Sequence, residues 1–187
     1  MNAVATPRRP KPKIATLAAW SIVVAFAVLG LKAGAWWMTG SVALYSDALE
    51  SIVNVIASGA AFWAIRVSYM PADDDHQHGH HKAEYFSAVL EGVLIAVAAL
   101  MIFAAAWDAL RMPRAMEQPW EGMAVNGLAS LVNVIWAMIL IRVGRAEKSP
   151  ALVADGHHIM TDVVTSVGVI AGLIAAVATG FAILDPL

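Results

Sequence analysis

Apolar residues in this chain gather in five long runs that are separated by short polar segments. The runs cover about residues 14–38, 42–65, 83–110, 123–141 and 151–180. A helix needs about 20 mostly apolar residues to cross the hydrocarbon core of a bilayer, and each run is close to or beyond that length. The pattern therefore predicts an all-α membrane protein with five transmembrane helices.

The composition agrees with a membrane protein and narrows the chemistry. Hydrophobic residues make up 60% of the chain and charged residues 14%, whereas about 25% of a soluble domain is charged. The net charge of -2 argues against a nucleic-acid partner. The chain has no cysteine, which excludes disulfides, a thiol nucleophile and a thiolate metal site. A metal site would have to use histidine, carboxylate or amide ligands.

The second apolar run carries an unusual polar stripe. Glu50, Asn54 and Ser58 recur every four residues, so they share one face of a helix. Asp47 lies one turn before Glu50 on nearly the same face. Lipid cannot solvate such a stripe, so it must face protein or water.

The fifth run carries a second polar pair near its start. His158 and Asp162 are four residues apart and lie on one helix face. His157 points about 100° away from His158, and we interpret it as an interfacial or supporting group. Asp47 and Asp155 each precede one of the pairs by three residues, and we interpret them as supporting or access residues rather than ligands.

The two polar pairs are expected to meet. With five spans, the second and fifth helices run in opposite directions, and a rise of about 1.5 Å per residue brings both pairs to similar depth. Glu50, Asn54, His158 and Asp162 would then form a cage of two carboxylates, one imidazole and one amide. Such a cage suits zinc, and its oxygen-rich balance also admits iron(II), manganese or cobalt. The alternative is that these groups only hydrogen-bond the helices together.

Two further features concern the regions outside this pair of helices. Residues 70–82 hold four of the six histidines, together with three aspartates. Histidine-rich tracts often bind metal, and a solvated charged loop is the alternative. Lys32 lies near the end of the first run, and we expect its ammonium group to snorkel to the membrane interface.

The basic residues predict an orientation. Residues 1–13 contain four basic residues and three prolines and are predicted to form a disordered cytosolic tail. With five spans, this tail, the histidine-rich loop and the basic linker at residues 142–150 fall on one side of the membrane. The excess of basic residues on the cytoplasmic side of membrane proteins then places the N-terminus in the cytoplasm. We expect a multi-pass protein of the cell membrane, the inner membrane in a Gram-negative cell.

Three segments of the chain resemble the membrane domain of the cation diffusion facilitators, a family of metal–proton antiporters. The segments are residues 36–54, 71–84 and 154–162, which contain the Trp-Trp-Met-Thr-Gly-Ser turn, the Pro-Ala-Asp-Asp-Asp-His loop and the Ala-Asp-Gly-His-His stretch. Family members place two ligands four residues apart on the second helix and two on the fifth. The resemblance therefore implies a transport site at Glu50, Asn54, His158 and Asp162.

The resemblance also leaves points open. Many members carry Asp or His followed by Asp on the second helix, so Glu50 with Asn54 departs from the pattern and leaves the metal undecided. Some members have a second metal site in the loop, which would correspond to Asp73, His76 and His80.

Members of this family usually have six helices followed by a soluble cytoplasmic domain that dimerises and binds metal. Residues 14–187 therefore resemble an incomplete cation-efflux transmembrane domain, in which the sixth helix and the cytoplasmic domain are missing. Lys82 matches a family lysine that helps to connect the membrane and soluble parts. The resemblance implies that the protein works as a homodimer.

The expected function is export of a divalent cation from the cytoplasm by proton antiport. Zinc is the first choice of cargo, and iron(II), manganese, cobalt and cadmium stay open. The expected partners are the membrane, the cation, protons and a second copy, without nucleic acid and without a cofactor other than the cargo. One alternative is a metal sensor or scaffold that keeps the fold without transport. Another is an intramembrane metal hydrolase, but the chain has no HExxH-like motif, so we expect no enzymatic activity.

Overall fold

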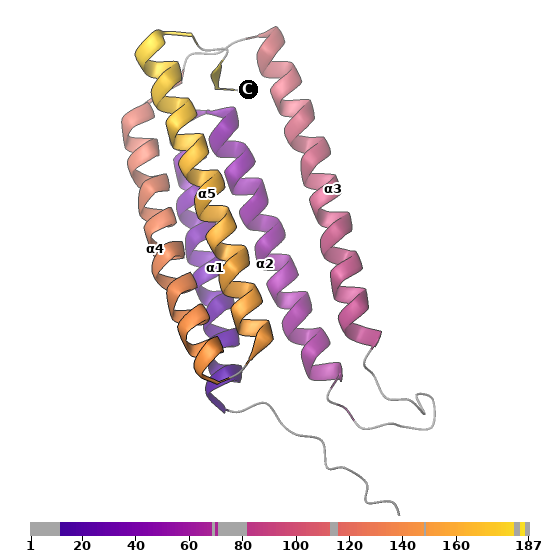
Figure 1. Ribbon diagram of the computed structural model, residues 1–187. Coiled ribbons are helices and arrows are strands. Elements are labelled where there is room, and N and C mark those ends of the chain that lie inside the picture. The colour runs from indigo at the N-terminus through magenta and orange to yellow at the C-terminus, as the bar shows by residue number, and fades with distance from the viewer. Residues whose placement is uncertain are drawn as a thin grey trace, which may run out of the picture.

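The computed structural model describes residues 12–68, 70, 82–112, 116–147, 149–181 and 184–185. Within these ranges the chain forms helices and no strand. The helices are α1 (Pro12–Thr39), α2 (Val42–Ser68), α3 (Lys82–Arg111), α4 (Pro119–Ala146) and α5 (Pro150–Thr179). Consecutive helices run in opposite directions along one bundle axis (Figure 1). The predicted all-α fold of five helices is confirmed.

Four of the helices close a ring. α1 packs against α2 and α4, and α5 packs extensively on α4 and over a shorter stretch on α2. α3 packs chiefly on α2 and lies outside the ring (Figure 1). The interior of the ring is therefore the place where side chains of α1, α2, α4 and α5 meet.

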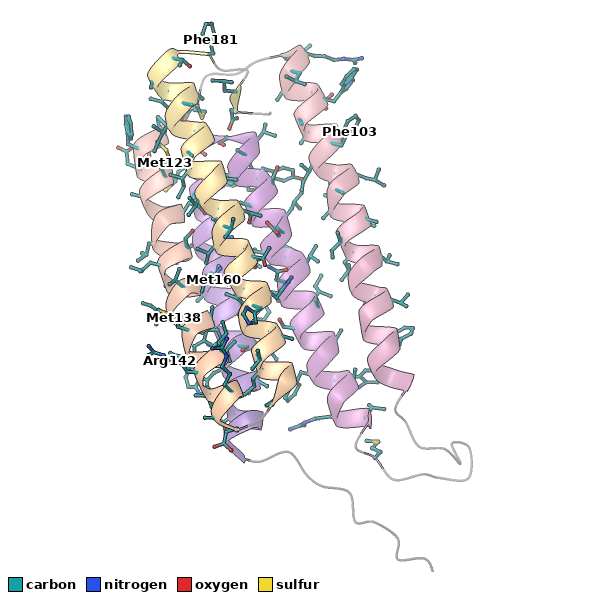
Figure 2. The ribbon with its side chains drawn as sticks, viewed as in Figure 1. Phe103, Met123, Met138, Arg142, Met160 and Phe181 are labelled. Carbon is teal, nitrogen blue, oxygen red and sulfur yellow. The ribbon has the colours of Figure 1, made fainter. Side chains whose placement is uncertain are left out.

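The outer surface of the bundle is apolar. Among the described residues, α1, α3, α4 and α5 each contain a stretch that is long and apolar enough to cross a membrane. Large apolar side chains cover the outside, such as Phe103 on α3, which is 69% exposed, and Met138 on α4 (Figure 2). Such a surface suits contact with lipid.

Glycines allow α4 and α5 to approach closely. A Cβ atom at Gly156 on α5 would lie 2.7 Å from Cγ1 of Ile141 and 3.0 Å from the backbone oxygen of Ala137, both on α4. Small residues at such crossings let helix backbones pack tightly within a membrane. Gly156 lies two residues before His158, so its close contact with α4 fixes the position of α5 near the candidate ligands.

The start of α2 is tied to the segment after α5. The Ser41 hydroxyl accepts a hydrogen bond from the Leu44 amide at 3.1 Å. The Asp185 carboxylate accepts hydrogen bonds from the amides of Val42 at 2.9 Å and Ala43 at 3.3 Å. A carboxylate at this position satisfies free amides and matches the positive end of the helix dipole. The contact joins the start of α2 to the segment that follows α5.

The expectation for Lys32 is wrong. Its side chain is fully buried, and its Nζ lies 2.6 Å from Oδ1 of Asp47 on α2. A buried ammonium group is costly in an apolar medium unless an acid partner satisfies it. Snorkelling was expected from the helix position of Lys32 alone, which does not reveal that α2 offers a carboxylate within reach.

Candidate metal site between α2 and α5

The four predicted ligands lie on facing sides of α2 and α5, and Asn54 is the link between three of them. The Asn54 Nδ2 group donates a hydrogen bond to Oδ2 of Asp162. The Asn54 Oδ1 atom lies 3.1 Å from Nε2 of His158. Because an amide oxygen only accepts, Nε2 carries the proton in this contact. Asn54 therefore joins the imidazole to the carboxylate.

Glu50 reaches α5 one turn further along. Its Oε2 atom lies 3.3 Å from Oγ1 of Thr165, and the same Oγ1 lies 2.9 Å from the backbone oxygen of Asp162. The single hydroxyl proton of Thr165 can serve only one of these acceptors at a time. Glu50 is thus held next to Asp162 through a weak, exchangeable contact.

Burial differs across the four ligands. Asp162 is 4% exposed, whereas His158 is exposed and Glu50 and Asn54 are half-buried. The site is therefore reached from the side of His158, and its deepest group is a carboxylate. Carboxylate, imidazole and amide oxygen together are a donor set that divalent cations accept.

Asn54, His158 and Asp162 are hydrogen-bonded to one another, and the predicted ligands are not arranged around a common point. Among the residues that the structure describes, no three His, Asp or Glu side chains are close enough to hold a metal ion together. A cation at this site would have to replace the hydrogen bonds that Asn54 makes. Imidazole would also have to lose the Nε2 proton before it could coordinate.

A cavity of about 30 Å³ with both polar and apolar lining residues adjoins the site inside the ring of helices. That volume is enough for one or two water molecules. Its lining includes the polar side chains Ser21, Ser51, Asn54, Ser58, Asn133, Trp136, Asp155, His158 and Asp162. The cavity therefore brings polar groups of α1, α2, α4 and α5 to the inner side of His158 and Asp162.

Three side chains in the lining of this cavity form a chain of hydrogen bonds. Trp136 Nε1 donates to the Ser21 hydroxyl at 3.0 Å, and Ser21 donates to Oδ2 of Asp155 at 3.1 Å. Asp155 is thus held by α1 and α4, one turn before His158. This arrangement agrees with the interpretation of Asp155 as a supporting residue, and no hydrogen bond to a predicted ligand is seen for it among the described residues.

The carboxylate of Asp47 contacts residues other than the predicted ligands. Its Oδ1 contacts Lys32, and the Ser166 hydroxyl lies 3.0 Å from each of its carboxylate oxygens. His157 is exposed, and its backbone oxygen accepts a hydrogen bond from Thr161.

Sequence reasoning missed Thr165 and Ser166, although both follow Asp162 at helical spacing on the same face.

The residues of the predicted loop site, Asp73, His76 and His80, lie outside the described residues. The sequence carried no signal for Ser21 or Trp136, because their role depends on α1 and α4 packing beside α5.

Comparison with known proteins finds relatives that match most of the chain. A family model described as the cation efflux transmembrane domain matches residues 18–187. The "Uncharacterized transporter sll1263" of Synechocystis is 49% identical over 167 residues, which are 89% of this chain and 54% of that protein. The "Cation-efflux pump FieF" of Salmonella arizonae is 33% identical over 150 residues, which are 80% of this chain and 50% of that protein. The chain spans about half the length of these relatives.

Proposed function

Because the chain belongs to the cation efflux transmembrane domain family, we propose that it carries a divalent metal cation across the membrane through Glu50, Asn54, His158 and Asp162. The observation that carries the proposal is the Asn54 amide, which contacts both His158 and Asp162 across two helices. A purely structural link between helices would not need an exposed imidazole and a buried carboxylate at its two ends.

The donor set supports zinc as the first cargo. Zinc takes tetrahedral sites of imidazole and carboxylate ligands, and two carboxylates would balance its two charges. The amide oxygen of Asn54 in place of a carboxylate also admits iron(II), manganese, cobalt or cadmium. The pump named FieF, similar to this chain over half of its own length, supports metal efflux in general.

Proton exchange follows from the ligand chemistry. The cation displaces the proton on Nε2 of His158 and the hydrogen bond from Asn54 to Asp162, and the released proton passes to water. On the opposite side, protons return to the ligands and the cation leaves. Metal moving out would thus be coupled to protons moving in.

The distribution of basic residues supports an orientation. Arg66 and Arg145 lie in the last turns of α2 and α4, at the end of the bundle where α1 begins, and Arg142 lies on α4 toward the same end (Figure 2). Arg111 lies at the opposite end. The excess of positive charge at the first end, with the basic N-terminal tail, supports a cytoplasmic position for that end. We infer a multi-pass protein of the cell membrane, the inner membrane in a Gram-negative cell, that works as a homodimer.

The test is metal flux into liposomes that contain the purified chain. Vesicles with an imposed pH gradient and an internal zinc-sensitive dye should report zinc uptake, and a pH-sensitive dye should report the opposing proton flux. Asp162→Asn should abolish both signals. The matched control is Asp108→Asn, since Asp108 is an exposed carboxylate on α3, and its flux should equal that of the unchanged chain.

Other outcomes would separate the alternatives. Metal flux that persists in Asp162→Asn would overturn the site. Metal binding that depends on Asp162, without flux in the unchanged chain, would point to a sensor or scaffold. Cleavage of peptide or ester substrates without flux would favour the hydrolase.

A further inference from the structure

A buried ion pair lies directly beside the candidate metal site. Lys32 on α1 and Asp47 on α2 are 2.6 Å apart, and their side chains are 0% and 1% exposed. Ser166 on α5 donates to the same carboxylate, with both oxygens at 3.0 Å. Three helices of the ring therefore meet at one carboxylate.

The pair is adjacent to the ligands on both helices. Asp47 lies one turn before Glu50 on α2, and Ser166 lies one turn after Asp162 on α5, each on the face of its ligand. The charges of Lys32 and Asp47 both act on Glu50 and on Asp162. The pair and the site thus share one electrostatic environment.

Helix packing alone does not account for a charged pair here. Ser, Thr and Asn side chains hydrogen-bond helices together within membranes without the cost of burying an ammonium group. The carboxylate of Asp47, however, is of the ligand type that the site uses. Left free, it would be a third carboxylate beside those of Glu50 and Asp162. Lys32 and Ser166 occupy both of its oxygens.

We propose that Lys32 determines which cations the site accepts, because it holds the Asp47 carboxylate away from the cation. This inference rests on the proposed binding of a cation by Glu50, Asn54, His158 and Asp162. With Asp47 withheld, the site has four ligands, which favours zinc. With Asp47 released, the site gains oxygen ligands, which favours cations of higher coordination number such as manganese.

The experiment measures zinc and manganese binding to the purified chain in detergent by titration calorimetry. Lys32→Met releases Asp47 and should raise manganese affinity relative to zinc by at least about tenfold, which corresponds to about 1.4 kcal/mol. Lys32→Arg keeps a cation next to Asp47 and should keep the original ratio. The ratio of the two affinities is the readout, because a lost positive charge alone would strengthen both metals together.

The double variant Lys32→Met with Asp47→Asn distinguishes an effect on metal selectivity from a structural role of the ion pair. Replacing both partners of a buried pair by neutral groups is usually tolerated. The double variant should bind both metals with the original ratio and affinity, because the proposal gives Asp47 no direct contact with the cation. A large loss of affinity would show that Asp47 is itself a ligand and would overturn the proposal, as would an unchanged ratio in Lys32→Met. If Lys32→Met fails to fold, Lys32→Gln takes its place, with the same expected rise in manganese affinity relative to zinc.

Asp162→Ala separates this inference from the proposed function. If Asp162→Ala binds both metals normally, the site itself is wrong. If it loses both metals while Lys32→Met keeps the original ratio, the site stands and only the role of Lys32 is overturned.

Discussion

The amide of Asn54 on α2 donates a hydrogen bond to the carboxylate of Asp162 on α5. A neutral side chain thus stands at a position where a carboxylate would repel Asp162. The contact holds α2 against α5 in the absence of cargo, and a cation that binds Asp162 must break it. The competition between this hydrogen bond and the cation makes Asn54 a determinant of affinity.

Asn54→Asp should strengthen metal binding and lower the stability of the metal-free protein. A unit charge about 4 Å from a divalent cation contributes several kcal/mol at an effective dielectric constant near 20, so affinity for zinc should rise at least about tenfold. Without metal, two carboxylates would face each other and the melting temperature should fall. Thermal unfolding with and without zinc would measure both effects. A metal-induced rise in melting temperature no larger than that of the unchanged chain would contradict the assignment of Asn54.

The two neighbouring histidines should behave differently. Loss of a group that only supports a metal ligand typically lowers metal affinity by about 10- to 100-fold. His158→Ala removes a ligand itself, so it should lower zinc affinity by more than this. His157→Ala is the matched control, because His157 is exposed and points away from the site. Titration calorimetry on both variants would check this, and equal losses would refute the choice of His158.

Metal binding should weaken as the pH falls. Cations bind the deprotonated ligands, so affinity is highest at high pH and is lost as imidazole and carboxylates gain protons. Nε2 of His158 must lose its proton before it can coordinate, so part of this loss should depend on His158. Binding titrations at a series of pH values in His158→Ala should show a flatter dependence than in the unchanged chain, and an unchanged slope would assign the proton to another group.

Gly156→Ala should displace α5 from α4. The added Cβ would lie 2.7 Å from Ile141 and 3.0 Å from a backbone oxygen, and overpacking of this kind costs about 1–3 kcal/mol. Gly168→Ala on the same helix is the control, since no atom lies within 4 Å of its added Cβ. Thermal unfolding should show a lower midpoint only for Gly156→Ala. Loss of stability in both variants would mean that the α4–α5 contact is not responsible.

Asp185→Ala should destabilise the start of α2. The carboxylate accepts hydrogen bonds from two amides at that helix end, and loss of such a cap typically costs about 1 kcal/mol. Asp185→Asn keeps an acceptor oxygen but loses the charge, so its effect should be smaller. Amide hydrogen exchange at Val42 and Ala43 would report the change locally. Unchanged protection in Asp185→Ala would show that the cap does not stabilise this end.

Much of the fold could be predicted because it follows from local pattern. The lengths of the apolar runs predict the helices, and the spacing of Glu50 with Asn54 and of His158 with Asp162 predicts which face of each helix carries polar groups. The helix ends agree less closely. α4 begins at Pro119 and ends at Ala146, outside the predicted range of 123–141, because polar residues at the membrane surface continue the helix beyond its apolar part.

The chain order and spacing by themselves determined that two polar faces would lie on antiparallel helices, since helical periodicity depends only on the sequence of one segment. Only the tertiary structure decided which groups meet across those faces. Lys32 pairs with Asp47, Ser166 joins them, and Asn54 stands between His158 and Asp162. Those partners are set by how closely α1, α2, α4 and α5 approach, and close contacts such as that of Gly156 with α4 depend on residues far apart in the chain.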